Sequence, residues 1–254
     1  MMINNLKILL HQRKQYLPDV TTVEVPGIFR GLPVISQEMI AEEKLEDCCP
    51  TGALSTLPVQ IDLGKCTFCG ECALRYPSKI KFTKEYKIAT NSRERLIVKE
   101  GLKKPIHLDP ALIRKEIGKY FSGSLKLRQV SAGGDGSCEL ELGACGNVNF
   151  DMGRFGIEFV ASPRHADGLV ITGPITQNMA EPLQICYDAI PDPKIIILAG
   201  TDAISGGIFA DSPAVDRSFL DTHTIDLYVP GNPIHPLTFI NGVLDLIRNR
   251  KEKK

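Results

Sequence analysis

Short apolar runs recur through the second half of the chain, and each ends close to a glycine or a proline. Runs that are apolar throughout are typical of parallel strands buried on both faces. Longer stretches with apolar residues at helical spacing lie between these runs or flank them. The pattern predicts strands at 156–160, 168–173, 194–200 and 224–229, and helices at 110–121, 179–189 and 237–248.

Alternation of strands with helices favours a flavodoxin-like α/β fold, in which helices cover both faces of a parallel sheet. In the helix predicted at 110–121, Ala111, Leu112, Ile117 and Phe121 share one side. Ligands of such folds bind at the carboxyl ends of the strands. We therefore expect chemistry in the loops that follow the predicted strands.

Composition narrows the class of protein. The 254 residues allow two unequal domains, and 43% hydrophobic with 24% charged residues is typical of a folded globular chain. The formal net charge of zero gives no nucleic-acid footprint. No apolar run reaches the length of a membrane span, and residues 1–14 lack the order of a secretory signal. We expect a cytoplasmic chain, free or held at the inner face of the membrane by partners, with cysteines that are thiols or ligands.

Three of the eight cysteines, Cys66, Cys69 and Cys72, form a C-x-x-C-x-x-C run. A bacterial ferredoxin loop continues this run with x-x-x-C-P, and its last cysteine ligates the other cluster of a pair. Tyr76 stands at that last position, before Pro77. One of the two clusters would therefore lack a ligand.

Upstream, Cys49 and Pro50 resemble the end of a second such loop. Counting back from Cys49 by the same spacing reaches no cysteine, so the ligand set of one cluster is missing at Met39, Glu42, Leu45 and Tyr76. The set of the other cluster is complete. We predict one 4Fe–4S cluster on Cys49, Cys66, Cys69 and Cys72.

Two alternatives stay open for these cysteines. Four thiolates also suit tetrahedral zinc, and unligated they would be inert buried thiols. Three ligands on one tight loop favour the iron–sulfur interpretation. Cys48 is interpreted as a small buried hydrophobe. The predicted organisation is a small ferredoxin-like domain at 1–93, a connector and helix at 94–124, and the flavodoxin-like parallel-sheet domain at 125–254.

The second half also carries long motifs: Gly136–Glu141, Arg154–Gly156, Ser162–Asp167, Thr172–Pro174, Pro191–Lys194, Ser205–Phe209 and Val229–Gly231. Together they resemble the small subunit of hydrogenlyase-type, membrane-bound nickel–iron hydrogenases. That family is similar to the quinone-proximal iron–sulfur subunit of complex I. The resemblance extends from Leu125 to about Ile247.

In the first half, Phe29–Gly31, Cys49–Leu54 and Asp62–Ile88 resemble the ferredoxin-like subunit of the same hydrogenlyase complexes. The two resemblances imply that neighbouring subunits are fused in one chain. They also imply an electron-transfer subunit of a hydrogenase-like or complex I-like oxidoreductase. Such a subunit docks on a hydrogenase-like large subunit and reaches any membrane subunits through the complex.

In that family the small subunit holds a 4Fe–4S cluster with four cysteines. The resemblance places the four positions, named here the degenerate site, at Asp135, Cys138, Asp202 and Asn232. Since iron of such clusters prefers sulfur, we expect the degenerate site to be empty. The alternative is a hard cation bound by oxygens of Asp135, Asp202 and Asn232.

The remaining reactive residues give no catalytic constellation. The chain lacks a nucleophile elbow, a Walker loop and a dinucleotide fingerprint, so we assign no catalytic residue and no complete active site. Cys145, Cys186, His165 and His235 are interpreted as structural. Glycines flank the altered positions of the degenerate site, which predicts that its loops keep special dihedrals: Gly200, Gly206, Gly207 and Gly231.

Two functions follow from these observations. The first is electron transfer through the single cluster to a large subunit. The second is a non-conducting structural or regulatory paralogue, because a cluster also supplies folding energy to a small domain. In the family the second cluster lies between the ferredoxin-like part and the partner, so its loss weakens the first hypothesis and leaves both open. Electron donor, acceptor and oligomeric state are open.

Overall fold

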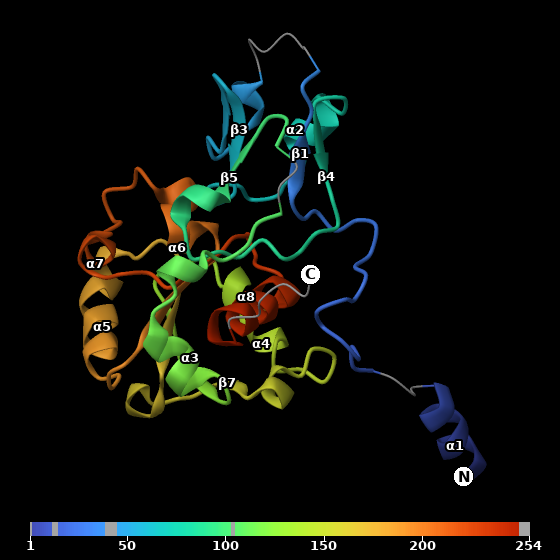
Figure 1. The fold of residues 1–254 in the computed structure, drawn as a ribbon, viewed down its shortest axis with the longest axis vertical. Coiled ribbons are helices and arrows are strands. Elements are labelled where there is room, and N and C mark those ends of the chain that lie inside the picture. The colour runs from blue at the N-terminus through green and yellow to red at the C-terminus, as the bar shows by residue number, and fades with distance from the viewer. Residues whose placement is uncertain (1, 12–14, 39–44, 103–104, 249–254) are drawn as a thin grey trace.

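The computed structural model of the chain describes residues 2–11, 15–38, 45–102 and 105–248. A small part made of short strands stands above a larger layered part with helices on both sides of a sheet (Figure 1). Helix α1 (Met2–His11) projects away from both. Of the positions predicted to have lost a cluster, Met39 and Glu42 lie outside the described residues. Leu45 is buried, and Tyr76 packs against the core.

The larger part contains a five-stranded sheet in the order β10-β9-β8-β6-β7, and every strand pair is parallel. The central strands β8 and β9 are buried along their whole length, which explains their continuous apolar runs. The four predicted strands are confirmed. The strands are β6 (Leu125–Ser131), β7 (Ile157–Phe159), β8 (Gly168–Thr172), β9 (Ile195–Ala199) and β10 (Leu227–Val229).

Helices cover the two faces of this sheet, each over its own apolar cluster. On one face α3 and α4 contact α8, whose side chains are almost all buried; on the other, α5 contacts α7. The helices predicted at 179–189 and 237–248 are confirmed. The helices are α3 (Lys115–Phe121), α4 (Ser137–Ala144), α5 (Gln177–Asp188), α6 (Thr201–Ser205), α7 (Ser218–Thr222) and α8 (Pro236–Arg248).

The helix predicted at 110–121 is wrong in its first half. A single turn, η4 (Pro110–Leu112), precedes α3, and Arg114 between them is extended. The physical reason is an ion pair. The Arg114 guanidinium donates to both carboxylate oxygens of buried Asp226, each at 2.9 Å, and the backbone at Arg114 is extended rather than helical so that the side chain reaches them. Further single turns are η5 (Met152–Phe155), η6 (Pro163–His165) and η7 (Gly207–Phe209).

The smaller part holds two antiparallel sheets. One pairs β1 (Pro33–Ile35) with β4 (Ile80–Phe82), and the other has the order β2-β3-β5. Strand β5 lies inside the range 94–124 assigned to a connector. The ferredoxin-like fold and the domain boundaries stay predictions. The other elements are η2 (Glu46–Cys48), β2 (Leu54–Thr56), β3 (Val59–Asp62), α2 (Glu71–Arg75), η3 (Arg93–Leu96) and β5 (Ile97–Lys99).

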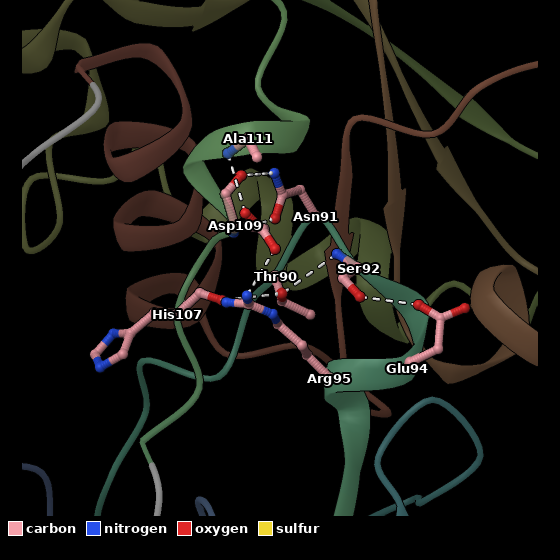
Figure 2. Close-up of polar contacts among 8 residues, drawn as sticks. All are labelled: Thr90, Asn91, Ser92, Glu94, Arg95, His107, Asp109 and Ala111. Carbon is pink, nitrogen blue, oxygen red and sulfur yellow. Dashed lines mark hydrogen bonds and ion pairs between the residues drawn. The ribbon is translucent and has the colours of Figure 1, made fainter.

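A polar network fastens the end of the smaller part to the segment that leads into the larger one (Figure 2). The Asn91 side chain exchanges two hydrogen bonds with the Asp109 backbone, at 2.9 and 2.6 Å. Arg95 donates to the His107 carbonyl and to the Asp109 carboxylate. These bonds satisfy backbone groups that lack partners in regular secondary structure, so the two segments are held as one unit.

No helix in the described part of the chain combines the length and the apolar character that a bilayer crossing requires.

Candidate metal centre

A tight loop presents the three clustered cysteines. The Asp62 carboxylate accepts the Gly64 amide at 2.8 Å, and the Asp62 carbonyl accepts the Cys66 amide at 3.0 Å. Phe68 and Gly70 then take positive φ angles of 54° and 81° and turn the chain into α2. Cys72 is therefore in the first turn of that helix, while Cys66 and Cys69 precede it.

Backbone amides of these segments point at sulfur. The Phe68 amide donates to Cys66 Sγ at 3.3 Å, and the Ala73 amide donates to Cys72. Cys49 follows η2 and receives the Ala53 amide on its Sγ at 3.2 Å. Such N–H···S bonds favour the charged thiolate, which is the form that binds metal.

The four predicted ligands line one pocket, named here the cluster pocket. Cys66 is buried and Cys69 is exposed. Burial raises the pKa of Cys66 to about 12 and that of Cys72 to about 11, and the neighbouring thiols add to both shifts. Metal binding here must therefore release protons. Among the described residues, no three His, Cys, Asp or Glu side chains converge closely enough to hold a single ion.

Two further residues shape the cluster pocket. Cys48 also lines it, is buried as expected, and donates its thiol to the Leu45 carbonyl at 3.0 Å. Arg30 donates to the Phe68 carbonyl at 3.1 Å, and its side chain lies where a Cβ on Gly70 would be, 2.7 Å from Nε. Arg30 belongs to the Phe29–Gly31 motif, but nothing in the sequence predicted its contact with a loop 38 residues away.

The degenerate site is assembled at the carboxyl ends of β6, β9 and β10. Ser137 links two of its members, since its hydroxyl lies 2.6 Å from an Asp135 carboxylate oxygen and 3.4 Å from Asn232 Oδ1. Cys138 packs under the loop after β9, where a Cβ on Gly200 would lie 2.6 Å from its Sγ. The four positions that the resemblance selected are thus neighbours around one loop cluster.

The electrostatics of the degenerate site are unfavourable for a carboxylate. Burial raises the pKa of Asp202, and the negative charges of Asp135 and Glu139 raise it further. Asp202 Oδ1 is buried with no hydrogen-bond partner among the described residues. Burial also raises the pKa of the Cys138 thiol to about 12.

The donor sets of the two sites differ in how well they suit a 4Fe–4S cluster. The four predicted ligands of the cluster pocket are all thiols, with amides aimed at three of them, and they fit the sulfur preference of such a cluster. The degenerate site offers one thiol and three oxygen-bearing side chains, and does not fit it. The glycine expectation is confirmed, because Gly200, Gly206, Gly207 and Gly231 all have positive φ.

The two sites touch through α6. The Thr201 hydroxyl donates to the Cys66 carbonyl at 2.8 Å, although the residues are 135 positions apart. The Arg217 guanidinium caps the carboxyl end of α6, where it donates to the Asp202, Ala203 and Ile204 carbonyls. Sequence reasoning missed both residues, because hydroxyl and guanidinium contacts to backbone leave no local pattern.

Of the four residues interpreted as structural, three are buried or partly buried and one is exposed. Cys145 is fully buried, and Cys186 is partly buried. His235 lies edge-on to Phe29 and Phe150, and burial lowers its pKa. His165 is exposed on η6.

Comparison with known proteins places the second half of the chain. The sequence pattern of the family described as NADH ubiquinone oxidoreductase, 20 Kd subunit, matches residues 136–246. A probable membrane-bound hydrogenase subunit of Pyrococcus furiosus is 34% identical over 129 residues, which are 51% of this chain and 77% of that protein. An NADH-quinone oxidoreductase subunit of Bacteroides thetaiotaomicron is 40% identical over 46% of this chain and 66% of its own length.

Formate hydrogenlyase subunit 7 of Escherichia coli is 36% identical over 56% of each chain. A solved structure of the membrane-bound sulfane sulfur reductase, an archaeal respiratory membrane complex, aligns with 54% of this chain and 77% of its own at 27% identity and a TM-score of 0.46. This chain therefore spans a little over half to about three quarters of these relatives. Through residues 136–246 the chain belongs to the NADH ubiquinone oxidoreductase 20 Kd subunit family.

Proposed function

We propose that the chain is an electron-transfer subunit carrying one 4Fe–4S cluster on Cys49, Cys66, Cys69 and Cys72. The observation that carries the proposal is the cluster pocket, where the thiols of these four residues, from two separate segments, line one space beside Cys48. Amide donors from Phe68, Ala53 and Ala73 compensate negative charge on three of the sulfurs. A cluster bound there would accept and release one electron at a time.

Different residues around the cluster pocket would serve different purposes in electron transfer. The buried Cys66 side excludes water and faces α6, whereas the exposed Cys69 thiol gives an electron partner access from the surface. Arg30 brings a positive charge to the loop backbone between them. Electrons would enter near Cys69 and leave toward the larger part of the molecule.

The partner we propose is a hydrogenase-like large subunit, docked at the face of the degenerate site. The names of the relatives support this, because they are subunits of membrane-bound hydrogenase, formate hydrogenlyase and NADH-quinone oxidoreductase. Leu140 on α4 and Ile208 on η7 follow positions of the degenerate site, and both are exposed apolar side chains. Such side chains suit a protein interface.

Anaerobically purified protein should carry about four iron and four acid-labile sulfide per chain. Cys66→Ser and Cys69→Ser should abolish this content, because each removes a ligand. Cys186→Ser is the matched control and should leave iron unchanged. About eight iron per chain would contradict the empty degenerate site, and stoichiometric zinc in place of iron would contradict the proposed cluster.

The second candidate is a non-conducting structural or regulatory subunit. The donor set of the degenerate site favours it, since a missing cluster lengthens the path to a partner. Rapid mixing of dithionite-reduced protein with a hydrogenase-like large subunit that forms a complex with it distinguishes the two. Oxidation of the cluster within the turnover time of the complex supports conduction, and a complex that forms without oxidation supports the structural role.

A further inference from the structure

A buried hydrogen bond from Thr201 to Cys66 joins the cluster pocket to the larger part of the molecule. Both residues are buried, with Thr201 fully inaccessible, and the oxygens lie 2.8 Å apart. The Thr201 hydroxyl donates this bond, and the Cys66 carbonyl accepts it. Cys66 is thus tied at its sulfur by its own loop and at its carbonyl by α6.

The approach of the Cys66 loop to α6 is close enough to require glycine. A Cβ on Gly64 would lie 2.8 Å from Ile204 Cγ2 and 2.7 Å from Arg93 Cζ. Arg93 in turn holds Asp62 with two hydrogen bonds, at 2.7 and 2.6 Å. The start of the loop is therefore fixed from one side by Arg93 and from the other by α6.

We propose that Thr201 is a positioning residue that sets the reduction potential of the cluster through the Cys66 carbonyl. The inference rests on the proposed function. Reduction adds negative charge to the cluster and its thiolates, so nearby dipoles shift the potential. The hydroxyl hydrogen of Thr201 carries partial positive charge and offsets the partial negative charge on the Cys66 carbonyl oxygen. This oxygen belongs to a proposed cluster ligand, so its charge acts on the cluster. Removal of this hydrogen-bond donor makes reduction of the cluster harder.

Thr201→Val tests this, because valine keeps the shape and removes the donor. Under anaerobic conditions, redox titration followed by the EPR signal of the reduced cluster should give a more negative midpoint than in the wild type, at unchanged iron content. Thr201→Ser keeps the hydroxyl and should restore the wild-type midpoint. Thr222→Val is the control, because it removes a threonine hydroxyl that donates to a backbone carbonyl of α7 instead, and it should match the wild type.

A second variant covers the case in which Thr201→Val does not fold. Thr201→Ala removes the same hydroxyl and needs less room than valine, so its midpoint should shift in the same negative direction. A wild-type midpoint in either folded variant overturns the role of Thr201. Failure of the proposed function is distinguishable, since wild-type protein would then lack iron and the EPR signal altogether.

Discussion

Asp202 is a carboxylate in an environment that disfavours its charged form. It is 6% exposed, one carboxylate oxygen has no hydrogen-bond partner among the described residues, and Asp135 and Glu139 repel its charge. An unsatisfied buried polar atom costs about 1–3 kcal/mol. The position thus keeps a buried carboxylate at a cost in stability.

Asp202→Asn should stabilise the protein at neutral pH by about 1 kcal/mol, because it removes the buried charge. Since the folded pKa of Asp202 is raised above 3.8, its contribution to stability is largest below that value and is lost as pH rises through the folded pKa. The advantage of the variant should therefore disappear on acidification. Thermal unfolding between pH 3.5 and 8 measures it, and a pH-independent difference would contradict the explanation.

At this scale the sequence predicted residues with a fixed local spacing and missed those defined by distant contacts. The four cysteines of the cluster pocket and the four positions of the degenerate site come together as expected. Arg30 and Thr201 act on backbone carbonyls 38 and 135 positions away, so no pattern marks them.

Among the elements, α3 depends on an interaction with the residue that precedes β10. Arg114, the residue before α3, pairs with Asp226, which is 4% exposed at its side chain. Asp226 also accepts the Ile196 amide of β9 at 2.9 Å. The pair therefore sets where α3 begins and fastens it to two adjacent segments of the sheet.

Arg114→Met should lower the free energy of unfolding by about 2–3 kcal/mol, because the buried Asp226 carboxylate loses its charged partner. Arg114 is itself partly exposed, which keeps the loss below that of a fully buried pair. Lys115→Met, one residue further and exposed, is the control and should change stability little. Urea unfolding at neutral pH measures both, and equal losses would exclude the ion pair as the cause.

The loops after β6, β9 and β10 keep the shape of a ligand-binding edge. Gly207 lies where a Cβ would overlap Asp202 Oδ1, and Gly200 packs against Cys138. Replacing Asp135, Asp202 and Asn232 together by cysteine should therefore permit a second cluster, raising iron to about eight per chain after anaerobic reconstitution. Single replacements should not. A folded triple variant with unchanged iron would show that the assigned ligand positions are wrong.

Elements with strong patterns were predictable, and elements that depend on their surroundings were not. Strands β8 and β9 are fully buried, so their apolar runs stand out. Strand β6 was missed because its sequence, Leu125–Ser131, interrupts apolar positions with Lys126, Arg128 and Gln129. The strands of the smaller part span three or four residues each, too few to show a period.

For the whole molecule, the important feature is an apolar cluster shared by its two parts. The cluster includes Ile61, Leu63 and Cys66 from the smaller part together with Leu198 and Ile204 from the larger one. Residues that pack in one cluster lose stability together when part of it loosens. The cluster pocket and α6 should therefore respond as one unit.

Chelation of iron from the anaerobic protein should accelerate amide hydrogen exchange at residues 45–72 and, through the Thr201 contact, at residues 201–205. Strand β8 lies at the centre of the sheet and should keep its protection. Hydrogen exchange with mass spectrometry measures all three segments. Faster exchange confined to 45–72 would show that the contact with α6 carries no coupling.

The two reciprocal hydrogen bonds between Thr90 and Tyr228, at 3.0 and 2.7 Å, have a consequence for how such a chain could arise or be divided. Strand β10 is one of the two edge strands of the sheet, and Thr90 occupies part of its open side. An open strand side invites pairing with other copies. If the two parts were expressed from separate genes, the larger part would expose the open side of β10 and would tend to self-associate. Binding of the smaller part as a separate subunit would cover that side again.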